Sequence, residues 1–108
     1  MICSLLVENI DQNLASHASA YNFAKALLAK KYHLNSVCFY GDTSAYFLAS
    51  GHKEAKRISK LWTSLAEKNE FDVCIYTNLK LEQEINVIDF SKLIKIMCSS
   101  DKTITFKA

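Results

Sequence analysis

The chain has 108 residues, of which half are apolar and 22% are charged, and this balance is typical of one soluble globular domain spanning residues 1–108. The formal net charge of +2 is too small to predict nucleic acid or an anionic membrane as the main partner. With two glycines and no proline, the sequence excludes the three-glycine dinucleotide fingerprint and the Walker phosphate loop.

The first residues and the cysteines indicate where the protein works. Residues 1–7 lack the basic lead-in and the cleavage site of a secretory signal, and no apolar run approaches the ~20 residues of a spanning helix. We therefore expect a cytoplasmic protein that does not enter a membrane. The cysteines lie far apart, without a C-x-x-C motif or a zinc-type Cys/His spacing, so we expect reduced thiols and no metal. They are Cys3, Cys38, Cys74 and Cys98.

The first half of the chain predicts a strand, a helix and a second strand. Residues 2–7 form a branched apolar run, which is typical of a central strand buried on both faces. Residues 16–31 carry apolar side chains at three- and four-residue spacing, which predicts an amphipathic helix. Asn35 predicts a turn, and residues 36–40 predict the second strand. A crossover of this length favours parallel pairing with a right-handed connection.

The second half repeats the alternation. Residues 41–51 predict a loop, in which the patch Tyr46-Phe47-Leu48 is either core or a surface that docks a sister subunit. Residues 53–69 predict the clearest helix, and residues 71–77 and 102–106 predict the third strand and a fourth strand at an edge. Between them, Asp89 is the expected N-cap of a helix. Its expected apolar stripe is Phe90, Leu93, Ile94 and Met97. The sequence therefore predicts a three-layer α/β/α domain with a mostly parallel sheet, a Rossmann-like topology without a nucleotide loop.

Cys74 is the first candidate for chemistry. Reactive groups in open parallel sheets gather beyond the carboxyl ends of the strands, and Cys74 lies closely before the loop that follows the third strand. The residues alone favour the alternative, a cysteine that packs as a small buried hydrophobe.

Five patches of sequence, in this order and spacing, resemble the DsrE/TusD-type sulfur-transfer proteins over nearly the whole chain. They are ASAYNFAKALL at 18–28, LNSVCFY at 34–40, WTSLA at 62–66, DVCI at 72–75 and DKTITF at 101–106. The resemblance implies a DsrEFH-like fold and places the family's sulfur-accepting cysteine on Cys74, at the end of its strand. It implies that Cys74 holds sulfane sulfur as a persulfide between donor and acceptor proteins, without a cofactor, in tRNA thiolation or sulfur oxidation.

The chain departs from the family pattern around this cysteine. Family members run into an arginine-rich Leu-Arg-Arg-Gly turn, whereas here Asn78 and Lys80 stand in that segment. A persulfide carrier reacts as the thiolate, so Lys80 and Asn78 are our candidates for supporting the anion. Glycine-containing segments after the first strand and before the last helix are also replaced.

Two alternatives to a sulfur carrier stay open. One is a non-catalytic scaffold subunit of a DsrEFH/TusBCD-like hetero-oligomer, and the other is a small-ligand or regulatory module with an incidental cysteine. The resemblance also implies a homo- or hetero-oligomer with related small α/β subunits, and we expect no direct contact with nucleic acid.

The remaining polar and thiol side chains are expected to have structural roles. Cys3 and Cys38 are expected in the core, and Cys98 is expected to pack while partly exposed. The histidines are expected at the surface or at helix ends, and the basic residues of the second helix on a solvated face. The histidines are His17, His33 and His52, and the basic residues of the second helix are Lys53, Lys56, Arg57 and Lys60. Of the histidines, His17 is predicted to lie nearest the Cys74 loop.

Overall fold

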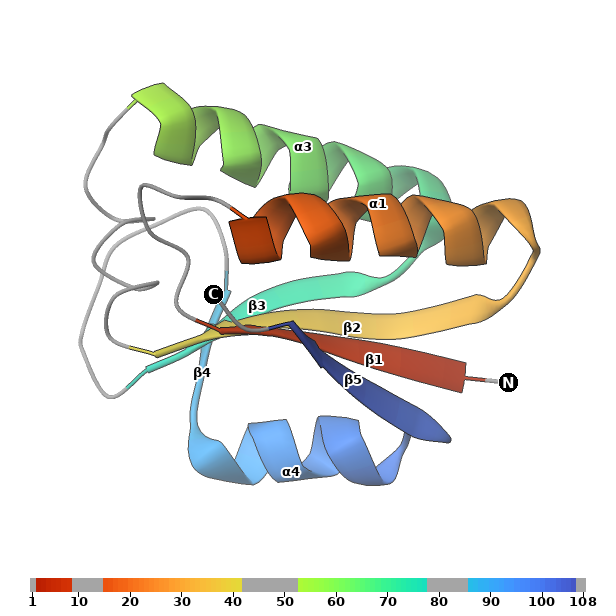
Figure 1. The fold of residues 1–108 in the computed structure, drawn as a ribbon. Helices are drawn as coiled ribbons and strands as arrows, with labels where there is room; N and C mark the ends of the chain where they lie inside the picture. Colours follow the sequence, from red (N-terminus) through yellow and green to blue (C-terminus); the bar gives the residue numbers. More distant parts are fainter. Residues whose placement is uncertain (1, 9–14, 42–52, 78–85, 107–108) are drawn as a thin grey trace.

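The computed structural model describes residues 2–8, 15–41, 53–77 and 86–106, which form a three-layer α/β/α domain. Its sheet has five strands, all parallel, in the order β4-β3-β2-β1-β5. Helices α1 and α3 cover one face of the sheet, and α4 covers the other (Figure 1). In chain order the elements are β1 Ile2–Glu8, α1 Ala15–Ala29, β2 His33–Tyr40, α3 Lys53–Asn69, β3 Asp72–Tyr76, β4 Asn86–Ile88, α4 Phe90–Cys98 and β5 Lys102–Phe106.

Two apolar cores hold the layers together. The larger core lies between the sheet and helices α1 and α3, and at its centre Trp62 and Phe39 have no exposed surface. The smaller core lies between the sheet and α4, where Leu6, Cys38, Cys74 and Ile96 are buried. Successive side chains of a strand point to opposite faces, so alternate residues of β1, β2 and β3 supply the two cores.

Both long helices end in the same hydrogen-bonded motif, although neither has glycine at the position that favours it. After α1, Lys31 has a φ of 64° and Tyr32 N–H donates to the Leu27 carbonyl at 3.1 Å. After α3, Glu70 has a φ of 57° and Phe71 N–H donates to the Ala66 carbonyl at 3.3 Å. These are Schellman-type ends, which turn the chain sharply back toward the sheet.

The expected order of strands and helices is confirmed, with two corrections. The structure adds β4, a three-residue strand that is too short to show an alternating pattern. Strand β2 begins at His33 rather than after a turn at Asn35. Asn35 lies at the register shift between β1 and β2, and its side-chain amide donates to Ser99 Oγ and Ser100 Oγ instead of opening a turn.

The apolar stripe predicted for the last helix is wrong in part. Ile96 is buried and Leu93 is half-buried against the sheet, whereas Phe90, Ile94 and Met97 are exposed. Helix α4 has apolar residues on both sides, so spacing within the helix did not distinguish the face that meets the sheet from the face that meets solvent. The predicted N-cap is confirmed, since the Asp89 carboxylate accepts a hydrogen bond from Lys92 N–H at 2.9 Å.

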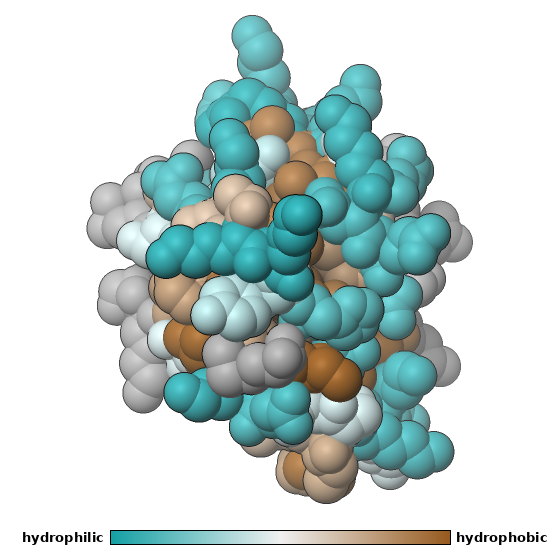
Figure 2. Space-filling view, turned by 90° about the vertical axis from the view of Figure 1, so that its right-hand side faces the viewer, coloured by the Kyte–Doolittle hydropathy of each residue, from teal (hydrophilic) through white to brown (hydrophobic). Residues whose placement is uncertain are grey.

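The end of the molecule at which the strands begin is hydrophilic over most of its surface. Figure 2 shows this end, where apolar surface emerges only in small areas between polar side chains. Within the described residues, no helix is long and apolar enough to cross a membrane.

Candidate functional site

Cys74 is the middle residue of β3 and points toward α4. Its register partner on the neighbouring strand β2 is Cys38, and both thiols belong to the smaller core. Cys74 is 3% exposed and Cys38 has no exposed surface. The sequence therefore predicts the strand correctly, but Cys74 lies within the strand and beneath a helix rather than at the strand's end.

Hydrogen bonds and burial keep the Cys74 thiol protonated in this conformation. Its Sγ donates to the Val37 carbonyl oxygen at 3.8 Å, and Cys38 Sγ donates to the Phe39 carbonyl oxygen at 3.7 Å. The adjacent Cys38 thiol and burial raise the pKa of Cys74 well above its ordinary value, and the Asp72 carboxylate raises it further. A reactive thiolate at this position therefore requires α4 to move or an ionic partner to approach.

Lys92 is a cation that the fold brings toward Cys74, and its charge lowers the pKa of that thiol against the stronger opposing effects. Lys92 lies in the first turn of α4. The same turn contacts the end of β3, because Phe90 packs edge-on against Tyr76 at a centroid distance of 6.1 Å. Sequence reasoning missed Lys92 because its proximity arises only when α4 folds back on the sheet. The predicted helpers Lys80 and Asn78 lie outside the described residues, as do His52 and the patch Tyr46-Phe47-Leu48.

The other two thiols lie away from this pair. Cys3 is fully buried in the larger core, on the opposite face of the sheet, and Cys98 is exposed at the end of α4. The predicted core positions of Cys3 and Cys38 are confirmed. All four cysteines are free thiols.

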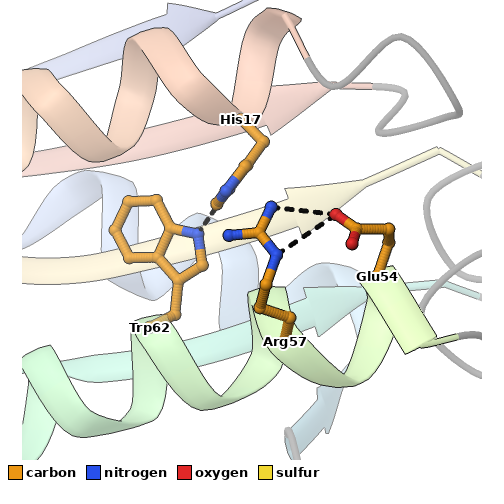
Figure 3. A network of polar contacts seen from close by, with 4 residues as sticks. All are labelled: His17, Glu54, Arg57 and Trp62. Atoms are coloured by element: carbon orange, nitrogen blue, oxygen red, sulfur yellow. Dashed lines mark hydrogen bonds and ion pairs between the residues drawn. The ribbon is translucent and has the colours of Figure 1, made fainter.

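The prediction of a surface or capping role for His17 is wrong. His17 is 5% exposed, and its Nδ1 accepts a hydrogen bond from Trp62 Nε1 at 2.9 Å, which joins α1 to α3 (Figure 3). Burial and then the nearby Arg57 guanidinium lower the pKa of His17 to about 4, so the imidazole is neutral at pH 7. Arg57 itself is held by the exposed Glu54 carboxylate at 2.9 Å. His17 therefore serves the larger core, across the sheet from Cys74.

A hollow of about 380 Å³ is lined by residues of α3 and by Tyr21 of α1, the two helices that pack on the face of the sheet opposite Cys74. Tyr21, Leu61, Arg57, Lys60 and Lys68 are among the residues that line it. The lysines and the arginine of the predicted solvated face are exposed, as expected. Within the described ranges, no group of three or more His, Cys, Asp or Glu side chains is arranged to hold a metal ion.

A comparison with protein-family models matches residues 4–106 to the DsrE/DsrF-like family. The chain belongs to this family. The match begins in β1 and ends with the last residue of β5, so it includes every strand that builds the DsrE/DsrF-like sheet. Family membership connects the chain with sulfur transfer and with a relay among partner proteins.

The fold of this DsrE/DsrF-like chain is also found in a solved structure. The crystal structure of the ychN protein from E. coli matches with a TM-score of 0.71 and 15% sequence identity, covering 98% of this chain and 99% of that one. At this identity the likeness establishes the fold alone. A search of curated proteins found no match.

Proposed function

We propose that this DsrE/DsrF-like chain is a sulfur carrier that accepts sulfane sulfur on Cys74 and passes it to the thiol of a partner protein. The observation that supports the proposal most strongly is the place of Cys74. It lies on the third strand of a family fold matched over residues 4–106, and it is the residue onto which the resemblance carries the acceptor cysteine. The destination of the sulfur, in tRNA thiolation or sulfur oxidation, would be set by the partners.

The transfer requires one thiol in this chain. The Cys74 thiolate attacks the outer sulfur of a donor persulfide, the donor leaves as its own thiolate, and Cys74 becomes Cys74–S–SH. A partner thiolate then attacks the outer sulfur and regenerates the Cys74 thiolate. Because the sulfur travels covalently, the step needs no bound cofactor.

The proposed reaction requires an accessible Cys74 thiol, and opening of helix α4 exposes it. The helix has nine residues, and the described contacts anchor it to the sheet chiefly through Leu93 and Ile96. A short helix held by few buried side chains opens at a lower free energy than the larger core. Opening exposes Cys74 to water, which lowers its pKa toward the ordinary value.

Persulfide loading followed by mass spectrometry tests the proposal. Reduced protein is mixed with glutathione persulfide, and a single gain of ~32 Da on the peptide containing Cys74 is expected soon after mixing. Cys74→Ala should abolish this gain, while the matched variant Cys3→Ala, which changes a buried thiol of the other core, should retain it. Sulfur found on the Cys98 peptide but never on the Cys74 peptide would contradict the assignment, as would the lack of any gain in every variant that retains Cys74.

A second candidate function, a non-catalytic scaffold subunit, is favoured by the outer surface of α4 and the adjoining β4. Val87, Phe90, Ile94 and Met97 are exposed there, which is a composition suited to contact with a related subunit. The burial of Cys74 also fits a chain that no longer exchanges sulfur. The loading experiment distinguishes the two functions, because a scaffold would take up no sulfur on Cys74.

A further inference from the structure

Cys38 is a buried nucleophile that the proposed relay does not use. It faces Cys74 across neighbouring parallel strands as its direct register partner, and both side chains point into the smaller core. Neighbouring strands in a sheet lie about 4.8 Å apart, which is within the Cα separation of about 4.4–6.8 Å that a disulfide bond spans. The pairing of β2 with β3 therefore gives the two cysteines a Cα separation that a disulfide bond can span.

The two thiols differ in the order in which a donor can reach them. Cys38 is on β2, the middle strand of the five, and has no exposed surface. Cys74 is one strand closer to the sheet edge formed by β4 and retains a small exposed fraction. A sulfur donor that enters from this edge therefore meets Cys74 first, and Cys38 meets a sulfur atom only after Cys74 has been loaded.

We infer that Cys38 is a resolving thiol, which discharges a Cys74 persulfide when no partner collects its sulfur. This inference rests on the proposed function. The Cys38 sulfur attacks the inner sulfur of Cys74–S–SH, so that the Cys38–Cys74 bond forms and the bond to the outer sulfur breaks. The outer sulfur leaves with the electron pair, takes the Cys38 proton and departs as hydrogen sulfide. The Cys38 thiol is oxidised and the sulfane sulfur is reduced, so no further oxidant is needed.

The surroundings of Cys74 favour attack on its inner sulfur. Attack on the outer sulfur would expel the Cys74 thiolate, and in thiol exchange the less basic group leaves faster. Burial and the adjacent thiol raise the pKa of Cys74, which makes its thiolate a poor leaving group in this core. Attack on the inner sulfur expels sulfide instead and leaves the two strands joined.

The resulting disulfide would be easily reduced. Side chains of register partners in a parallel pair project side by side, so their Cβ atoms stay about one strand spacing apart, whereas a relaxed disulfide needs a Cβ separation of about 3.5–4.5 Å. Strained disulfides are the labile ones, so small thiols should restore the dithiol after discharge. The pair would therefore limit how long an uncollected persulfide is held.

The test compares full-length protein with and without Cys38, in a Cys98→Ser background that removes the exposed thiol. Each protein is loaded with glutathione persulfide, freed of excess donor, and followed by intact mass, peptide mapping and released sulfide. We expect Cys38→Val to hold its ~32 Da gain at least about 10-fold longer than the parent. The parent should end ~2 Da below its reduced mass, with a Cys38–Cys74 linked peptide and one sulfide per chain. The matched variant Cys3→Val should behave as the parent.

The outcomes separate the inference from the proposed function. If the parent and Cys38→Val hold the gain equally long and no linked peptide forms, the resolving role is overturned and the carrier function stands. Sulfur recovered on the Cys38 peptide would also overturn the resolving role. If neither protein loads, both proposals fail together. As an independent arm, oxidised glutathione should convert the parent to the linked form, and a lasting mixed disulfide with glutathione would contradict the pairing.

Discussion

Trp62 and His17 are 45 residues apart in the chain and are joined by a buried hydrogen bond of 2.9 Å from the indole Nε1 to the imidazole Nδ1. The bond requires a neutral imidazole with its proton on Nε2, because a protonated ring has no acceptor at Nδ1. It connects α1 with α3 across the larger core, next to the edge-on contact of Tyr21 with the same indole at a centroid distance of 5.1 Å. The stability of this core therefore depends on the protonation state of His17.

The His17 contact predicts a loss of stability in mild acid. The folded pKa of about 4 is below the unfolded value of 6.5, so between these pH values the unfolded chain binds more protons than the folded one. The free energy of unfolding should therefore fall as the pH drops from 6.5 to 4, by about 3 kcal/mol from this group. Urea unfolding followed by the fluorescence of Trp62, the one tryptophan in the sequence, measures this directly.

His17→Asn is the matched control, because its amide oxygen can replace Nδ1 as the acceptor and does not titrate. This variant should lose about 3 kcal/mol less than wild type over the same pH range. Equal pH slopes in the two proteins would show that another group is responsible.

The burial of the thiols predicts their order of alkylation. Cys98 is exposed and should react with N-ethylmaleimide at the rate of an ordinary thiol. Cys3, Cys38 and Cys74 are 0–3% exposed and should react at least ~100-fold more slowly, because each must wait for local opening. Among them Cys74 should react first, because it lies under α4 one strand from the sheet edge and keeps a small exposed fraction, whereas Cys38 lies on the central strand and has none. Mass spectrometry of timed samples counts the labels, and rapid labelling of Cys3 would contradict its burial in the larger core.

Removal of the Asp89 cap should expose Cys74. The carboxylate accepts the Lys92 N–H at the start of α4, and a lost N-cap destabilises a helix by about 1 kcal/mol. Asp89→Ala should therefore raise the alkylation rate of Cys74 about 5-fold in a Cys98→Ser background. Glu54→Ala removes an exposed carboxylate from the other side of the sheet and should leave this rate unchanged. An equal rate in Asp89→Ala and its parent would mean that α4 does not control access.

The left-handed residue after α3 predicts a stabilising substitution. Glu70 has a φ of 57°, which costs a residue with a Cβ atom about 1 kcal/mol relative to glycine. Glu70→Gly should raise the free energy of unfolding by up to about 1 kcal/mol. Lys68→Gly, placed two residues earlier inside the helix, should lower it by a similar amount. A loss of stability in both variants would contradict the left-handed conformation at Glu70.

Local patterns were enough to predict most of the elements. The three- and four-residue spacing of Ala20, Ala24 and Leu27 predicted α1, and these three side chains are buried. Asp89 was identifiable as an N-cap because the capping hydrogen bond reaches only three residues along the chain. Cys74 could be selected by resemblance and by its strand, but its neighbour in space could not, because strand register depends on the pairing of β2 with β3.

The sequence by itself determined the α/β class, the order of the predicted helices and of strands β1, β2, β3 and β5, and the strand that carries Cys74, because these follow from interactions between residues a few positions apart. The tertiary structure decided the rest: the burial of His17 against Trp62, the face of α4 that meets the sheet, and the juxtaposition of Cys38 with Cys74. The contacts of His17 with Trp62 and of Cys38 with Cys74 join residues 45 and 36 positions apart in the chain. The buried face of α4 depends on competition between two apolar sides of one helix. Only packing of the whole chain, which buries one set of side chains and leaves the other in water, resolves them.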